Sequence, residues 1–119
     1  MFQEALRNVV DGVDGGLAGM VMDFEGIPLD SYSRQDTEFD IESVGAEASV
    51  LVKAIQRATE MLDAGETHEV SIKSDRVTTL IRVLNQTYFV ALTLTPDGNL
   101  GKARYLLRVL APKLADELG

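Results

Sequence analysis

The spacing of apolar residues changes in a regular order along this chain, from helical to strand-like and back. Near the N-terminus apolar residues recur at steps of three and four, which predicts a short helix with one buried face. That face consists of Phe2, Ala5, Leu6, Val9, Val10 and Val13. Two strand-like runs follow at residues 17–24 and 27–33, joined by the turn Glu25-Gly26. They predict a β-hairpin, and Pro28 places the second strand at a sheet edge because proline has no N–H to donate.

Helical and strand-like spacing alternates again in the rest of the chain. A polar loop at 33–40 is expected to end on Asp40, a candidate N-cap for a long helix at 41–62. Three strand-like runs at 67–74, 77–84 and 87–95 are separated by two-residue connections, which predicts an antiparallel meander. A final helix is predicted at 100–118, with a kink or break at Pro112, because proline removes an amide and crowds the carbonyl of Arg108.

The long helix carries two apolar stripes. The first is expected to pack on the sheet and consists of Ile41, Val44, Ala48, Leu51, Ile55, Ala58 and Leu62. The second lies about 115° around the helix axis and consists of Ala46, Val50, Ala54 and Met61. A helix that covers one side of a sheet needs only one stripe, so the second indicates an interface with another chain. The alternative is that a flanking helix or loop of the same chain covers it.

A dimer built on the second stripe alone would have only a thin margin over the cost of association. Pairing of the free edge of the strand at 67–74 is the natural addition. The predicted dimer interface is therefore Ala46, Val50, Ala54, Met61, Val70 and Ile72. Charged residues beside the stripe, Lys53, Arg57 and Glu60, are predicted to form the polar rim of a partner-binding surface.

The composition and net charge of the chain make some classes of binding partner unfavourable. The 119 residues, 45% of them hydrophobic, suit a single domain spanning 1–119. With 19 acidic and 11 basic residues, the net charge of −8 disfavours binding to nucleic acid and to anionic membranes. The chain has no cysteine, and it shows neither a secretory signal nor an apolar run long enough to span a bilayer. We therefore expect a cytoplasmic protein.

Four groups of residues are candidates for chemical sites. Asp23 and Glu25 could form a carboxylate pair, but a solvated turn explains them more simply. The Gly-Asn-Leu-Gly-Lys run at 98–102 lacks the full glycine spacing of a phosphate loop. His68 is the only histidine and makes neither a zinc site nor a nucleophile relay by itself. The cluster of Lys102, Arg104 and Arg108 in the last helix either pairs with acids or meets an acidic partner. We expect no catalytic, cofactor or metal site.

The order of elements resembles the roadblock (dynein light chain) family. Two local motifs support the resemblance, the run at 21–29 (Val-Met-Asp-Phe-Glu-Gly-Ile-Pro-Leu) and the run at 99–104 (Asn-Leu-Gly-Lys-Ala-Arg). The resemblance implies an α+β fold in which a five-stranded antiparallel sheet has a long helix on one face and the terminal helices on the other, as in profilin. It also implies dimerisation through the long helix and the adjacent strand, and binding to Ras-like small GTPases or related roadblock proteins.

Within the family, the chain is similar to the bacterial gliding-motility polarity proteins of the MglB and MglC type. Because it ends at Gly119, just after the last predicted helix, the shorter MglC-like form is the closer expectation. The leading functional prediction is a non-enzymatic, dimeric adaptor without cofactors. The alternative is a small-ligand or signal-sensing domain of profilin- or PAS-like shape, which would need a pocket between sheet and helix.

Overall fold

A computed structural model describes residues 1–34 and 40–119, and it contains the predicted elements in the predicted order. These are α1 (Gln3–Asp11), β1 (Gly16–Asp23), β2 (Pro28–Ser33), α2 (Ile41–Met61), β3 (Glu69–Lys73), β4 (Thr78–Val83), β5 (Tyr88–Leu94) and α3 (Leu100–Leu118). Most of the predicted loop at 33–40 lies outside the described residues. Its last residue, Asp40, is the N-cap of α2 as predicted, since its side chain accepts hydrogen bonds from the Glu42 amide and the Ser43 hydroxyl.

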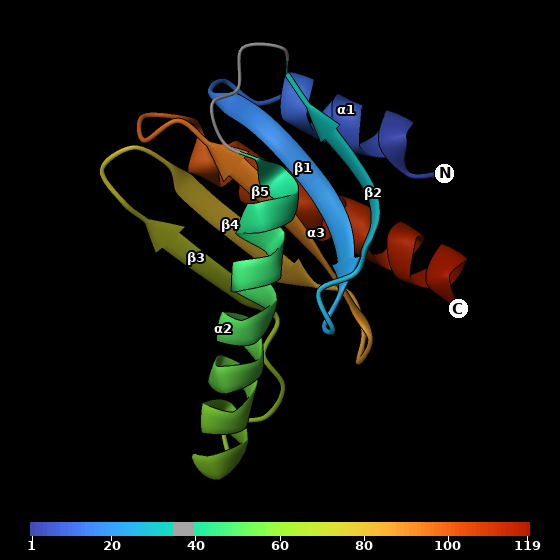
Figure 1. Cartoon of the computed structure of the whole chain (residues 1–119), viewed down its shortest axis with the longest axis vertical. Coiled ribbons are helices and arrows are strands. Elements are labelled where there is room, and N and C mark those ends of the chain that lie inside the picture. Colours follow the sequence, from blue (N-terminus) through green and yellow to red (C-terminus); the bar gives the residue numbers. More distant parts are fainter. Residues whose placement is uncertain (35–39) are drawn as a thin grey trace.

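All five strands form one antiparallel sheet in the order β2-β1-β5-β4-β3 (Figure 1). β1 pairs with β5, which joins the N-terminal hairpin to the meander. Pro28 opens β2 at one edge of the sheet, and β3 forms the other edge, as the sequence predicted. The predicted sheet and the placement of helices on its two faces are confirmed.

Two apolar cores lie on opposite faces of the sheet, because side chains alternate along each strand. α1 and α3 cover one core, whose largest buried residues include Leu6, Leu80, Leu92, Leu94, Leu107 and Leu114. α2 covers the other, which contains Met20, Met22, Phe24, Ile81 and Phe89. The sheet therefore separates α2 from the two terminal helices (Figure 1).

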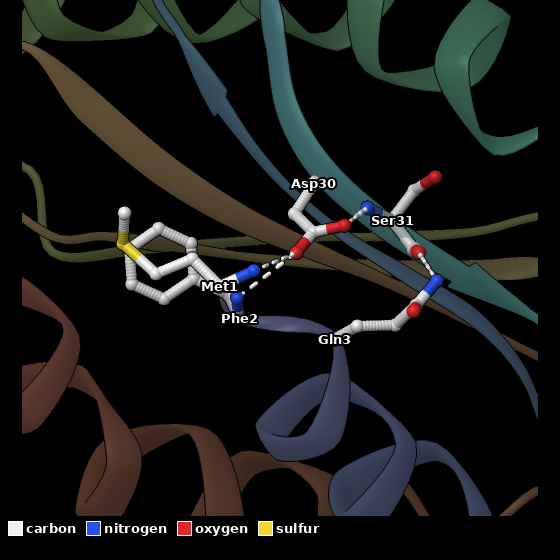
Figure 2. Close-up of polar contacts among 5 residues, drawn as sticks. All are labelled: Met1, Phe2, Gln3, Asp30 and Ser31. Carbon is white, nitrogen blue, oxygen red and sulfur yellow. Dashed lines mark hydrogen bonds and ion pairs between the residues drawn. The ribbon is translucent and has the colours of Figure 1, made fainter.

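A carboxylate on β2 holds the beginning of α1 (Figure 2). Asp30 Oδ2 accepts hydrogen bonds from the Met1 ammonium at 3.1 Å and from the Phe2 amide at 2.9 Å, while Oδ1 accepts one from the Ser31 amide at 3.0 Å. Phe2 is the N-cap of α1 and has no capping hydrogen bond from its own side chain. Asp30 thus supplies from a neighbouring strand the negative charge that favours a helix N-terminus.

α3 continues through Pro112 as one helix, so the predicted break does not occur. The missing amide leaves the carbonyl of Arg108 without its usual helical partner. Both residues are exposed, and water can therefore satisfy that carbonyl. The inward face of the helix, with Ala103, Leu107, Ala111 and Leu114, stays packed on the sheet.

Candidate interaction surface

α2 is longer than the sheet it covers. Its 21 residues span roughly 32 Å at about 1.5 Å per residue, whereas five strands about 4.8 Å apart span roughly 19 Å. The buried residues of α2 all lie in its first 12 positions: Ile41, Gly45, Ala48, Ser49 and Val52. The C-terminal part of the helix extends past the sheet (Figure 1).

Gly45 allows the first half of α2 to approach β1 closely. A side chain there would overlap the methyl group of Met20 and crowd that of Met22, and both methionines are fully buried. Ser49, one turn further on, bonds its hydroxyl to the Ala46 carbonyl instead of presenting an unpaired group to the core. Small residues therefore anchor the helix at one end and leave the other end outside the core.

The predicted core stripe of α2 is wrong in its second half. Leu51, Ala58 and Leu62 were expected on the sheet, but all three are exposed, Leu62 to 78%. Periodicity identifies residues that share a helix face, but it does not show where the sheet beneath that face ends. The lengths of the predicted elements contained part of this signal, because a helix of 22 residues is roughly 33 Å long and exceeds the roughly 19 Å width of a five-stranded sheet.

The predicted second stripe is not covered by the chain. Val50 is 69% exposed and Met61 83% exposed, and Ala46 and Ala54 are exposed beside them. Together with the residues displaced from the core, they form what we call the α2 apolar face: Ala46, Val50, Leu51, Ala54, Ala58, Met61 and Leu62. One carboxylate, Glu47, interrupts this face.

The free edge of β3 lies on the same side of the molecule (Figure 1). The His68 carbonyl and the Ser74 amide bond to β4, so the backbone groups of the alternate residues Glu69, Ser71 and Lys73 point toward the open edge. Val70 and Ile72 lie opposite Ile81 and Thr79 in the register and therefore share the face of the sheet that α2 covers. Ile72 is exposed there. An open strand edge and an exposed apolar helix thus lie on one side of the molecule.

The three charged residues predicted as a rim are not equivalent. Lys53 is half-buried, and its Nζ lies 3.3 Å from Glu25 Oε1 in the β1–β2 turn. Arg57 and Glu60 are exposed, with no ion pair among the described residues. On the helical wheel all three lie on the side that faces the β1–β2 turn. The rim therefore borders only one side of the α2 apolar face.

A polar cleft of about 720 Å³ opens at the projecting end of α2. Its walls are the end of α2, the segment that leads into β3 and the β4–β5 turn, and its ionisable residues are Glu60, Asp63, Glu66 and His68. A hydrogen bond between the Thr59 and Thr67 hydroxyls, 2.9 Å apart, joins two of these walls. The region between sheet and helix is occupied by the buried side chains of the second core. The cleft is thus not in the position that a profilin- or PAS-like ligand pocket would require.

Turn geometry accounts for the predicted carboxylate pair. Asp23 Oδ1 accepts hydrogen bonds from the amides of Glu25 and Ile27, each at 2.9 Å, which closes the β1–β2 turn. Glu25 pairs with Lys53 as described above. Each carboxylate therefore has a structural role.

The run at 98–102 is a helix cap. The amides of Gly98, Asn99, Leu100 and Lys102 all have acceptors within the chain, and the acceptor for Lys102 is the Asn99 side chain at 3.0 Å. A phosphate loop needs such amides free to bind the phosphate. In the described parts of the chain, no group of three His, Cys, Asp or Glu residues is arranged to hold a metal ion. No helix there is long and apolar enough to cross a membrane.

The basic cluster of the last helix is divided between two environments. Arg104 Nε bonds Glu69 Oε2 on β3 at 2.8 Å. Lys102 and Arg108 are exposed and form no ion pair among the described residues, although the Arg108 guanidinium lies 5.9 Å from the centre of the Tyr105 ring. Only one of the three cations therefore follows the predicted pairing with an acid.

These features define a class of small α+β domain with an exposed helix and an open strand edge on one side. The fold is also that of profilin IA from Acanthamoeba castellanii, which has a TM-score of 0.61 at 12% identity and is covered over the full length of both chains. The Roadblock/LC7 domain model matches residues 3–93, and the chain belongs to the Roadblock/LC7 family. A comparison with curated proteins found no match.

Solved structures refine this placement. The chain is 40% identical to MglC from Myxococcus xanthus, with 98% of each chain covered and a TM-score of 0.70. A Roadblock/LC7 domain from Streptomyces avermitilis has a TM-score of 0.86 at 14% identity, covering 98% of this chain and 96% of that one. The gliding protein MglB from Thermus thermophilus has a TM-score of 0.84 at 15% identity, covering 95% and 84%. The predicted likeness to the MglB and MglC branch, and to MglC in particular, is confirmed.

Proposed function

We propose that the chain is a non-enzymatic adaptor that forms a homodimer and binds a Ras-like small GTPase or a related roadblock protein. We place it in the cytoplasm, in a bacterial system for motility or cell polarity. The observation that carries the proposal is that the exposed α2 apolar face and the open edge of β3 lie on the same side of the molecule (Figure 1). The 40% identity to MglC supports the cellular context. A structure of an MglB protein described as a tetrameric arrangement is consistent with assembly in this fold.

A dimer with its two-fold axis beside β3 would bury both the α2 apolar face and the open edge of β3. Antiparallel pairing of β3 with its copy satisfies the outward backbone groups of Glu69, Ser71 and Lys73. The same operation places the two α2 helices side by side on one face of the joined sheet. A standard interface takes roughly 800 Å² from each partner, which is more than a single stripe of small side chains provides. Helix contact and strand pairing are therefore both needed.

Substitution of a carboxylate into the α2 apolar face tests the dimer. Val50→Glu or Ala54→Glu should shift the protein to monomer, because an unpaired carboxylate buried at the interface costs several kcal/mol. Sedimentation equilibrium at tens of micromolar measures the change. Val109→Glu, the same exchange at an exposed position on α3, is the matched control and should leave the dimer intact. A monomeric wild-type protein at that concentration would refute the symmetric dimer.

The rim residues provide a separate test of partner binding. Arg57→Glu should slow association with the partner and change its salt dependence, since exposed rim charges act mainly on the association rate. Binding is measured by interferometry against a Ras-like GTPase and against an MglB-type roadblock protein. The dimer should persist in this variant. Arg7→Glu, at an exposed position on α1 across the sheet from α2, controls for the change of net charge.

Three outcomes would contradict parts of this proposal. Wild-type association kinetics of Arg57→Glu at low salt would move the partner site off this helix. Nucleotide hydrolysis by the isolated chain, abolished by one substitution, would show an enzyme. Binding of neither protein, together with a metabolite recovered from the native cytosol on the purified chain, would favour the ligand-sensing alternative.

A further inference from the structure

The outward face of α3 differs in charge from the rest of the molecule. The helix carries four basic residues and two acidic ones, a net charge of +2, while the whole chain carries −8. The rest of the chain therefore carries a net charge of −10. Three of the four bases are exposed, namely Lys102, Arg108 and Lys113, and the two acids, Asp116 and Glu117, are exposed beyond them at the end of the helix. In the part of the chain that the structure describes, no carboxylate pairs with any of these three.

Apolar side chains lie between these cations. Tyr105 is 55% exposed and Val109 46% exposed, and Pro112 is exposed one turn further along. Their spacing of four and three residues places them on one face. The Arg108 guanidinium lies against the Tyr105 ring, which helps to hold the ring on the surface. We call this set the basic α3 face: Lys102, Tyr105, Arg108, Val109, Pro112 and Lys113.

Stability of the helix does not explain the residues at its beginning. Asn99 is the N-cap, so Lys102 occupies the third helical position, where glutamate would complete a capping box and complement the helix dipole. The first turn contains no acid. Gly101 beside it has the low helix propensity of glycine, although a side chain there would meet only Asn99 Oδ1 at an ordinary 3.7 Å. The first turn is thus less stable than the fold permits.

We propose that the basic α3 face binds an acidic segment of a partner protein, with an aliphatic or aromatic side chain of that segment on Tyr105 and Val109. Apolar centre and charged rim are the usual anatomy of a protein interface. A short acidic segment suits the site better than a membrane or a nucleic acid. At low and moderate salt, the net charge of −10 on the rest of the chain would repel an extended polyanion.

This surface is independent of the proposed dimer. α3 and α2 lie on opposite faces of the sheet (Figure 1), so a molecule paired through α2 and β3 still presents its basic α3 face. The inference therefore goes beyond the proposed function, and each can fail without the other. A dimer would present two copies of the face, which strengthens binding to a partner with two acidic segments.

The test uses the full ¹⁵N-labelled chain and a synthetic peptide in which glutamates surround a leucine and a phenylalanine. Amide shift changes should concentrate at residues 101–113, and affinity should fall as salt is raised. A peptide with lysine in place of each glutamate is the control probe and should not bind there. Shift changes confined to other elements would overturn the proposal, as would equal binding of both peptides or preferential binding to vesicles containing anionic lipid.

Lys102→Glu separates binding from folding. It should weaken peptide binding about tenfold, because one favourable charge contact becomes a repulsive one. The melting temperature should stay constant or rise, because glutamate suits this helical position. Tyr105→Ala should weaken binding by at least about tenfold through loss of the aromatic anchor. Arg76→Glu, at an exposed position in the β3–β4 turn, carries the same charge reversal and should bind as wild type. Wild-type affinity of Lys102→Glu would overturn the proposal.

Discussion

At the scale of single residues, Asp30 shows how one carboxylate can hold two distant segments together. Partial burial raises its pKa, but hydrogen bonds from the N-terminal ammonium and from the Phe2 and Ser31 amides outweigh burial, so the pKa lies below its ordinary 3.8. A lowered pKa means that the folded state prefers the ionised form. Asp30 therefore stabilises the fold above the ordinary pKa, and the contribution disappears as the pH falls through the lowered value.

Asp30→Asn should lower the free energy of unfolding at neutral pH by about 1–2 kcal/mol, since a charged acceptor of several hydrogen bonds becomes neutral. The difference from wild type should shrink as the pH is lowered below about 3.8. Urea titrations over a pH series measure it. Asp116→Asn, at an exposed carboxylate on α3, is the control and should have little effect. A constant difference across the series would contradict the role of the charge.

This contact could not be predicted from the sequence. Asp30 and Phe2 are 28 residues apart, and they meet only because β2 lies beside the beginning of α1. The Arg104–Glu69 pair has the same origin, since it joins α3 to a strand 35 residues earlier. By contrast, the cap at Asp40 depends on residues two and three positions away and was predicted correctly. Local contacts are readable from the sequence, whereas contacts across the fold are not.

At the scale of elements, apolar periodicity and turn residues predicted every helix and strand of the described chain. The placement of α2 was the main error, because a stripe at helical spacing does not reveal how much of it finds a sheet. The predicted interface residues on α2 are exposed, and the structure adds Leu51, Ala58 and Leu62 beside them. Their role in a dimer remains a prediction. Pro112 was expected to kink or break α3, and the break did not occur.

Pro112→Ala should raise the free energy of unfolding by about 1 kcal/mol. The substitution restores the amide that bonds the Arg108 carbonyl and removes the contact of the proline ring with that carbonyl. Part of this gain is lost because alanine leaves the unfolded chain more freedom than proline. Thermal and urea denaturation measure the change, and Ala115→Gly, in the same helix, should shift stability in the opposite direction. A clearly lower melting temperature for Pro112→Ala would show that the proline is required by the fold.

At the scale of the whole molecule, net charge gives the two proposed surfaces opposite responses to salt. Two chains that each carry a net charge of −8 repel each other, and Glu47 adds a carboxylate to the α2 apolar face itself. Added salt should therefore strengthen the dimer, because screening reduces this repulsion and leaves apolar contact intact. It should weaken binding of an acidic segment to α3. Sedimentation and peptide titration at low and at physiological salt measure both trends, and a dimer that weakens with salt would contradict this assignment.

The overhang of α2 also has a consequence for local stability. No residue of α2 beyond Val52 is buried, so the backbone hydrogen bonds of this half should open at a lower free energy than those of the half on the sheet. Short helices are only marginally stable without tertiary contacts. Any partner that covers the overhang must therefore also order it, and part of the binding free energy is used for that purpose. Hydrogen exchange of the amides at 53–61 should therefore become slower when a partner binds there. This change would report binding even where the identity of the partner is not known.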